Sequence, residues 1–165
     1  AVLPWKVDPS KVFFPPEVLK MRTRQWRSDG PLEMLLAKQD EKTLTNDREC
    51  YNGGLLRIRG RVFDKGLGTH AGSEIVYRLN PADGWKLFTA YAGIDDCSAP
   101  VGTVDFQVWV DGRLVARSGK LSMKNQPVPI WADLTGAREL KLVVDDCGDG
   151  INGDIADWGE ACIRK

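Results

Sequence analysis

The sequence predicts an all-β protein, an antiparallel and jelly-roll-like β-sandwich that follows a short helical or irregular N-terminal extension. From Gly53 onward, short runs of residues alternate apolar and polar side chains, as strands with one buried face do. Turn residues separate these runs, and about eight runs within roughly 110 residues are typical of a sandwich. We therefore expect residues 50–165 to form the sandwich and residues 1–49 to form an extension packed on it.

The first half of the sandwich contains three predicted strands. Leu56, Ile58 and Val62 alternate with arginines, and Ile75–Leu79 alternates in the same way. Trp85–Ile94 is apolar at both parities. This pattern predicts a strand that is covered on both faces.

The second half contains a predicted hairpin. Val104–Val110 alternates, and Asp111-Gly112 directly after it can supply the two positive φ angles of a tight turn before Leu114–Ala116. Further strands are expected at Val128–Leu134, at Leu140–Val144 and around Cys162.

The first fifty residues lack this alternation. Pro16–Arg27 and Pro31–Lys42 each begin with a proline, which suits the first position of a helix, and both contain few β-branched residues. Two short helices broken at Ser28-Asp29-Gly30 or a long irregular excursion are both compatible with the pattern.

The composition excludes several kinds of partner. Lys plus Arg and Asp plus Glu each total 23, so the chain lacks the basic excess of a nucleic-acid-binding protein. Its apolar stretches fall well short of the ~20 residues that cross a bilayer. We therefore expect neither nucleic acid nor a membrane as partner. A secretory signal is absent, but a chain that starts at Ala1 without Met is expected to be trimmed.

The four cysteines fit neither a paired zinc cluster nor a thioredoxin motif. Cys97 and Cys147 each follow two aspartates at the end of an apolar run, which predicts neighbouring loops and a Cys97–Cys147 disulfide. Cys50 precedes the first strand of the sandwich and Cys162 lies in the last, so Cys50–Cys162 is the complementary pair. The two bridges would indicate a secreted or extracytoplasmic protein. The alternative is four reduced cysteines in a cytosolic protein.

The sequence resembles the NPCBM family, which corresponds to carbohydrate-binding module family 51. The matching segments cover roughly residues 50–163 in the family's order and are listed here as they stand: Asn52-Gly53-Gly54, Phe63-Asp64-Lys65-Gly66-Leu67-Gly68-Thr69-His70-Ala71, Ile75-Val76-Tyr77, Gly93-Ile94-Asp95-Asp96, Val108-Trp109-Val110-Asp111-Gly112, Leu134-Thr135-Gly136-Ala137-Arg138-Glu139-Leu140, Asp149-Gly150 and Ala156-Asp157-Trp158. Leu3-Pro4-Trp5 resembles the family's opening. The chain departs from the family pattern at Ile155, where a histidine is usual, around residues 13–46, and in its cysteines.

This resemblance implies a β-sandwich module without catalytic activity that binds a galactose-type sugar. It also implies a covalently linked catalytic domain in a larger glycoside hydrolase outside the cytoplasm. An enzymatic role finds no support in the residues either, because the chain has one histidine and the adjacent Asp95 and Asp96 of a strand point to opposite faces. The alternative is a structural or protein-interaction module without sugar binding.

A sugar site needs a flat apolar surface for the ring and fixed polar groups for its hydroxyls. Trp158 is the predicted platform, and the predicted hydrogen-bonding residues are His70, Asp96, Asn152 and Asp157. The structural alternative places Trp158 in the core and makes His70 a cap for a neighbouring backbone group.

Two further tryptophans fall on the outward parity of their strands. Trp109 and Trp131 could form a stacking face for an extended glycan, or they could lie beneath the N-terminal segment. We prefer the second interpretation, in which the segment gains an apolar surface to cover. Trp85 is expected to be ordinary core packing.

The stretch Asp145–Asp157 is rich in the oxygen ligands that calcium prefers. It is not an EF-hand loop, because Cys147 and Ala156 occupy ligand positions 3 and 12. A calcium site of another kind would compensate the repulsion between these carboxylates and fix the loops. The predicted ligands are Asp149, Asp154 and, by analogy of fold, Glu160.

Overall fold

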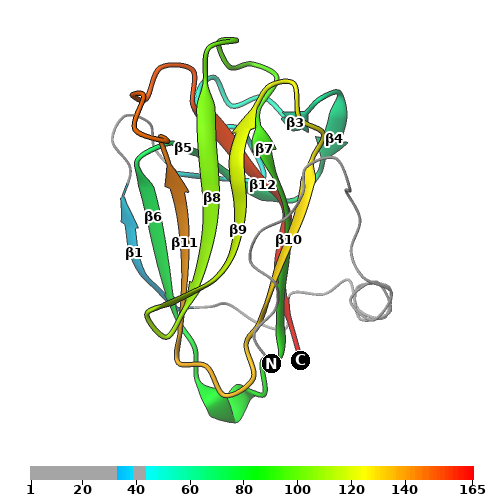
Figure 1. Cartoon of the computed structure of the whole chain (residues 1–165). Coiled ribbons are helices and arrows are strands. Elements are labelled where there is room, and N and C mark those ends of the chain that lie inside the picture. The colour runs from blue at the N-terminus through cyan, green and yellow to red at the C-terminus, as the bar shows by residue number, and fades with distance from the viewer. Residues whose placement is uncertain (1–32, 39–43) are drawn as a thin grey trace.

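The computed structural model describes residues 33–38 and 44–165 and shows two five-stranded antiparallel sheets packed face to face (Figure 1). The first sheet has the order β1 (Glu33–Lys38), β6 (Ser73–Arg78), β11 (Glu139–Asp145), β8 (Thr103–Val110) and β9 (Arg113–Ser122). The second has the order β10 (Val128–Asp133), β7 (Leu87–Ile94), β12 (Ile155–Arg164), β5 (Gly66–His70) and β2 (Thr45–Asn46). A small hairpin of β3 (Leu56–Ile58) and β4 (Arg61–Phe63) and the 3-10 helix η1 (Pro81–Asp83) complete the described elements. The predicted fold class is confirmed.

Turn chemistry predicted the β8–β9 hairpin correctly. Val110 pairs with Arg113, and the two residues between them, Asp111 and Gly112, have φ angles of 49° and 76°. Both angles lie in the left-handed region that a two-residue turn of this kind requires. The turn sets the pairing at the start of β9, and two bulges, between Val108 and Trp109 and between Asp105 and Gln107, shift the register further along.

The core lies between the inner faces of the two sheets. Residues of β7 alternate between that core and the outer face of the second sheet, and all of them except Tyr91 are buried. The prediction of a strand covered on both faces is therefore confirmed. Trp85 is buried in the same core, as expected.

The N-terminal part differs from the predicted extension. Glu33–Lys38 is a strand that pairs with β6, so the helical interpretation of Pro31–Lys42 is wrong for these residues. Helix propensity is a weak preference, and pairing with an available sheet edge outweighs it here. β1 and β2 each supply an edge strand, and the sheets therefore begin before residue 50. Pro16–Arg27 lies outside the described residues, and no described segment forms a helix able to span a membrane.

The two predicted disulfides are absent, since all four cysteines are free. The Sγ of Cys50 donates to the carbonyl of Thr69 at 2.9 Å, and Cys162 lies beside Thr89 on the paired strand β7. Each thiol thus has a partner of its own. Cys97 and Cys147 are likewise separate, because Cys97 contacts Glu49 whereas Cys147 lies in the loop after β11.

The β3–β4 hairpin packs on the outer face of the second sheet (Figure 1). Glycines make this close approach possible. A Cβ on Gly93 would lie 2.4 Å from a methyl carbon of Ile58, and one on Gly159 would lie 2.7 Å from the ring of Phe63. The outer face of the sheet therefore has no side chains at these two glycines, and the apolar side of the hairpin packs there.

Candidate functional site

The second sheet brings most of the predicted sugar-binding residues to one end of the sandwich. His70 pairs with Ile155, and Asp157 pairs with Gly93. Asp96 follows the end of β7 by two residues and therefore lies near the same end. Strands β5, β12 and β7 thus gather segments that are far apart in the sequence.

Trp158 is not at this surface. Its side chain is 0% exposed, and its ring meets the rings of Phe106 and Phe88 edge to face at centroid distances of 4.8 and 6.1 Å. The predicted stacking platform is therefore wrong, and the structural alternative describes this residue. The physical reason is the alternation of β12, in which Ala156 and Trp158 point inward and Asp157 points to the outer face.

His70 is also buried, with 3% of its surface exposed. Its Nδ1 lies 3.3 Å from the carbonyl oxygen of Ala71, as the backbone-capping alternative expects. The His70 ring therefore offers almost no exposed surface to a ligand in this arrangement. Ligand contact by His70 stays a prediction.

Asp157 lies beneath the β3–β4 hairpin next to a second buried carboxylate. Oxygens of Asp95 and Asp157 accept the same backbone N–H of Arg57, at 2.9 and 3.2 Å. Burial, and then the neighbouring Asp95, raise the pKa of Asp157 well above its ordinary value. The pair therefore anchors the hairpin backbone, and Asp157 is inaccessible to a ligand in this arrangement.

Asp96 anchors the tip of the same hairpin but remains exposed. Its carboxylate accepts the backbone N–H groups of Arg59 and Gly60, both at 2.8 Å, and its own N–H donates to the carbonyl of Arg57 at 2.8 Å. A carboxylate with two oxygens has further acceptor capacity. Asp96 can therefore meet a sugar hydroxyl while it holds the hairpin.

Sequence reasoning missed the loop 49–54. The buried carboxylate of Glu49 accepts backbone N–H groups of Tyr51, Asn52 and Gly54 and the thiol of Cys97. Burial raises the pKa of Glu49, but the donors, led by Gly54, outweigh burial and leave this pKa below its ordinary value. The loop is thus fixed from inside.

This fixed loop presents Tyr51, which is 59% exposed and is the one aromatic among the exposed large apolar residues of the described segments. An aromatic directly before Asn52-Gly53-Gly54 was the signal available in the sequence. An exposed ring on a rigid loop has the shape that a sugar face needs. Tyr51 therefore replaces Trp158 as the candidate platform.

Groups from β8 and β9 compensate the charge of residues 145–154, here named the acidic loop. Asp149 accepts from the Nζ of Lys120 at 2.8 Å and from the hydroxyl of Thr103 at 2.6 Å. Asp154 accepts the backbone N–H of Thr103 at 2.8 Å, and its second oxygen is buried without a hydrogen-bond partner. Burial raises the pKa of Asp154 to about 6. Asn152 is exposed between these residues.

The predicted calcium ligands do not come together. Glu160 lies six residues along β12 from Asp154, which is on the order of 20 Å in a strand, and it pairs with Arg61 at 3.9 Å. Among residues 33–38 and 44–165, no group of three or more acidic, cysteine or histidine side chains is placed to hold a metal. The predicted three-residue set is wrong, and the calcium prediction now depends on Asp149 and Asp154.

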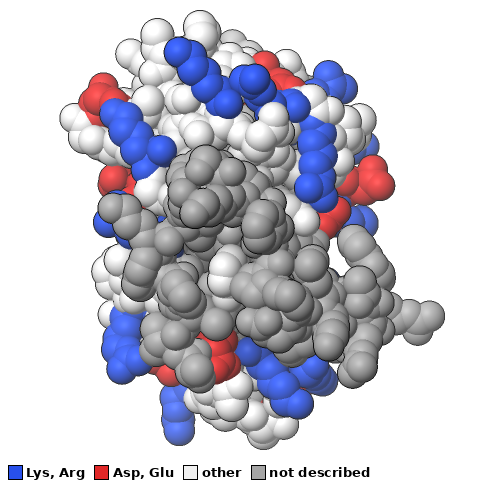
Figure 2. Space-filling model, turned by 45° about the vertical axis from the view of Figure 1, so that its right-hand side comes forward, with Lys and Arg blue, Asp and Glu red and all other residues white. Residues whose placement is uncertain are grey.

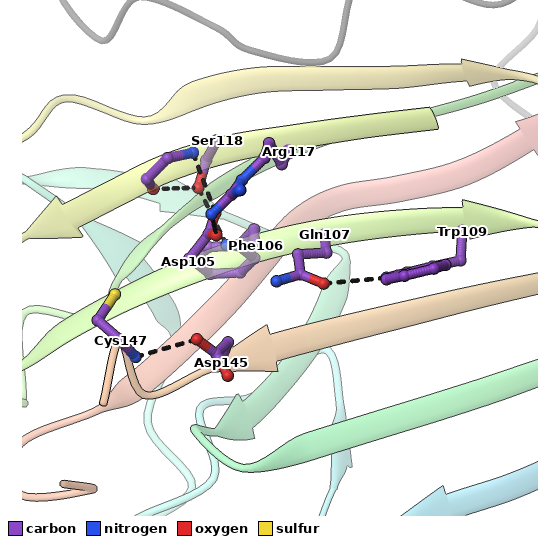
Figure 3. A network of polar contacts seen from close by, with 9 residues as sticks. Asp105, Phe106, Gln107, Trp109, Arg117, Ser118, Asp145 and Cys147 are labelled. Carbon is purple, nitrogen blue, oxygen red and sulfur yellow. Dashed lines mark hydrogen bonds and ion pairs between the residues drawn. The ribbon is translucent and has the colours of Figure 1, made fainter. Parts of the chain in front are cut away.

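The outward-facing tryptophans are covered to different degrees. Trp109 is half-buried, and its Nε1 donates to Gln107 at 3.0 Å (Figure 3). The ammonium group of Lys141 lies 4.9 Å from the ring centroid of Trp109. Trp131 is only 8% exposed. Neither ring forms an open face, and the expectation that the N-terminal segment covers them falls outside the described residues.

The chain matches known carbohydrate-binding modules along most of its length. The NPCBM/NEW2 domain model matches residues 23–164. The structure is similar to a CBM51 module of the GH95 protein from Clostridium perfringens in complex with methyl-galactose, with a TM-score of 0.75 and 32% identity, over 81% of this chain and 95% of that one. It is also similar to the CBM51-2 and INT domains of Clostridium perfringens ZmpB in complex with GlcNAc, with a TM-score of 0.73 and 33% identity, over 81% of this chain and 30% of that one.

A curated relative extends this likeness to a glycoside hydrolase. The chain is 30% identical over 129 residues to alpha-1,3-galactosidase B of Akkermansia muciniphila, which covers 76% of this chain. It spans 16% of that relative and 8% of a second one. The catalytic activity of such parent proteins lies in separate domains. The chain therefore belongs to the NPCBM/NEW2 domain family and is a non-catalytic carbohydrate-binding β-sandwich module of the CBM51 type.

Proposed function

We propose that this module binds a galactose-type sugar at the end of the sandwich formed by loop 49–54, the β7–β8 connection and the acidic loop. The observation that carries the proposal is the similarity to the CBM51 module in complex with methyl-galactose, which this chain matches over 95% of that module's length. The curated relative named for galactosidase activity supports the same class of sugar.

The contact residues follow from exposure. Tyr51 supplies the surface for the ring of the sugar, and the exposed Asp96 and Asn152 supply polar groups for its hydroxyls. His70 and Asp157 are buried beneath this surface, where His70 contacts the backbone carbonyl of Ala71 and Asp157 accepts the backbone N–H of Arg57. Because one ring and few polar groups take part, we expect weak affinity for a single sugar.

We propose further that the module is part of a larger, extracytoplasmic glycoside hydrolase and holds the enzyme near its glycan. The small share of the curated relatives that the chain spans supports a multidomain parent.

Calcium is proposed only as a structural ion of the acidic loop. The buried oxygen of Asp154 that lacks a partner and the nearby Asp149 support this role. Lys120 already compensates part of the negative charge. A calcium-dependent rise in the melting temperature, reversed by a chelator, would support the proposal, and an unchanged melting temperature would contradict it.

Calorimetric titration with methyl galactoside tests the sugar proposal. We expect saturable binding that is weakened at least tenfold in Tyr51→Ala, because one stacked ring contributes a large part of a small interface. Trp109→Ala is the matched control, since it removes a half-buried aromatic from the outer face of the first sheet and should leave affinity unchanged. Absence of binding to galactosides and to every sugar of a glycan array would favour a protein-interaction module instead.

A further inference from the structure

The β3–β4 hairpin, residues 56–63, presents three arginines near the proposed sugar site. Its apolar residues Leu56, Ile58 and Phe63 are buried against the second sheet. Arg57 and Arg59 are exposed. The hairpin therefore has one apolar side that attaches it and one cationic side that faces solvent.

Carboxylates hold the backbone of Arg57 and Arg59. The N–H of Arg57 donates to Asp95 and Asp157, and the N–H of Arg59 donates to Asp96. Here two guanidinium groups project from a backbone that is fixed before any ligand arrives, which lowers the ordering cost of binding.

Among the described residues, the charge of these two guanidinium groups is not paired with a carboxylate. In the part of the chain that the structure describes, no carboxylate lies within 4.0 Å of the guanidinium of Arg57 or Arg59. Arg61 is engaged in a different way, because it lies 4.1 Å from the ring centroid of Tyr91 and pairs with Glu160. The carboxylate oxygens of Asp96 face the backbone of the tip, which leaves the two guanidinium groups available.

The location of the hairpin connects it with the proposed sugar site. Asp96 contacts both, since it binds the hairpin tip and is exposed at the end of β7. Leu55 and Val62 are each 42% exposed and give the surface an apolar component beside Arg57, which pairs with Val62. Figure 2 shows Lys and Arg side chains next to one another at the top of the molecule, the end at which Figure 1 places β3 and β4.

We propose that Arg57 and Arg59 form an accessory subsite for an anionic group of the glycan, either a sulfate ester or a sugar carboxylate, next to the neutral sugar. The planar guanidinium donates paired hydrogen bonds to such oxyanions, which a lysine cannot match in geometry. The proposal rests on the proposed function for its neighbouring sugar. It extends the ligand of the module from a neutral galactoside to an acidic glycan.

The test compares three probes by calorimetry: methyl galactoside, galactose 6-sulfate and sialyllactose. For the wild-type module we expect one or both acidic probes to bind roughly three- to tenfold more tightly than the neutral probe, as one or two partly exposed charge-assisted hydrogen bonds allow. The two acidic probes distinguish sulfate from carboxylate. The gain should shrink in high salt, because exposed charges are screened.

The decisive variant is Arg57→Gln with Arg59→Gln. It should lose the gain for the acidic probes and keep the affinity for methyl galactoside. Arg113→Gln with Arg138→Gln removes two exposed arginines from other positions and should behave like the wild type. Because surface changes alter stability little, both variants should melt within about 2 °C of the wild type.

The outcomes separate this proposal from the proposed function. Equal affinity for neutral and acidic probes, or equal loss in the control variant, overturns the subsite. Binding of an acidic probe through these arginines without any binding of methyl galactoside supports the subsite and overturns the neutral-sugar proposal. Arginine-dependent binding of polyglutamate but of none of the three sugars would overturn the glycan subsite and identify an acidic protein surface as the partner.

Discussion

Two regions near one end of the sandwich differ in the partners of their carboxylates. Glu49, Asp95 and Asp157, here named the buried carboxylates, point at backbone N–H groups of loop 49–54 and of the β3–β4 hairpin. In the acidic loop, Asp149 is exposed and meets Lys120 and Thr103. The first arrangement builds the shape of the surface, whereas the second neutralises a loop that remains accessible.

The pKa values express the same difference. Burial and the neighbouring Asp95 raise the pKa of Asp157, whereas the hydrogen bond from Lys120, and then that from Thr103, lower the pKa of Asp149. Asp154 belongs to the acidic loop by sequence but is buried, and its pKa is raised to about 6. The environment of a carboxylate, rather than its position in an acidic stretch, therefore decides its role.

Removal of Glu49 should have the largest effect in this comparison. Glu49→Ala leaves three backbone N–H groups without their acceptor, and we expect a loss of about 2 kcal/mol in the free energy of unfolding. This corresponds to a fall of roughly 4–8 °C in the melting temperature. Glu139→Ala on β11 is the control, and an equal effect of the two changes would refute a special role for Glu49. Because loop 49–54 carries Tyr51, sugar affinity should fall as well.

The pH dependence should distinguish the members of the buried carboxylates. A carboxyl whose pKa is raised in the folded state stabilises the fold below its unfolded pKa and loses that contribution as the pH rises through the folded pKa. Asp157 is of this kind, so it should make the protein less stable as the pH rises above 3.8, its ordinary value. Glu49 has a lowered pKa and acts in the opposite sense, since its contribution is present above 4.5 and is lost as the pH falls below that value.

The protein should lose stability as the pH rises above 3.8, the ordinary pKa of an aspartate, and Asp157→Asn should reduce this fall in melting temperature. We expect an effect of intermediate size. The amide has no charge to bury, and its oxygen can still accept the N–H of Arg57. Asp83→Asn in the exposed η1 helix serves as the control. Curves for Asp157→Asn and wild type that run parallel from pH 4 to pH 9 would show that Asp157 does not carry the pH dependence.

Lys120→Gln in the region of the acidic loop should have the smallest effect, because exposed ion pairs contribute little and salt screens them. We expect a melting temperature close to that of the wild type in high salt and slightly lower in low salt. The same variant sharpens the calcium proposal, since loss of the lysine should increase the stabilisation that calcium provides. A calcium response that Lys120→Gln leaves unchanged would place any bound ion elsewhere.

The site was only partly predictable from the sequence. Asp96 and Asn152 are exposed as their loop positions indicated, whereas Trp158 is in the core. The last strand gives no clear alternation in Ile155–Gly159, and a bulge at Glu160, where φ is 51°, changes its register. The direction of Trp158 therefore could not be read from its neighbours. Tyr51 was missed because an aromatic before Asn52-Gly53-Gly54 does not by itself indicate that Glu49 fixes this loop and leaves the ring exposed.

By itself the sequence determined most strands of the sandwich, such as β6 to β11, because a period of two and turn residues such as Asp111-Gly112 act over a few neighbouring positions. Only the tertiary structure decided what depends on distant residues. β1 is a strand because β6 offers it an edge, and folding places the thiols of Cys50, Cys97 and Cys162 beside residues other than cysteine. Asp96 and Asp157, which were predicted as sugar ligands, are anchors because a hairpin 36 to 100 residues away presents its backbone to them. Local chemistry thus specifies elements, whereas burial and partners, which set each side chain's role, arise only when the sheets pack.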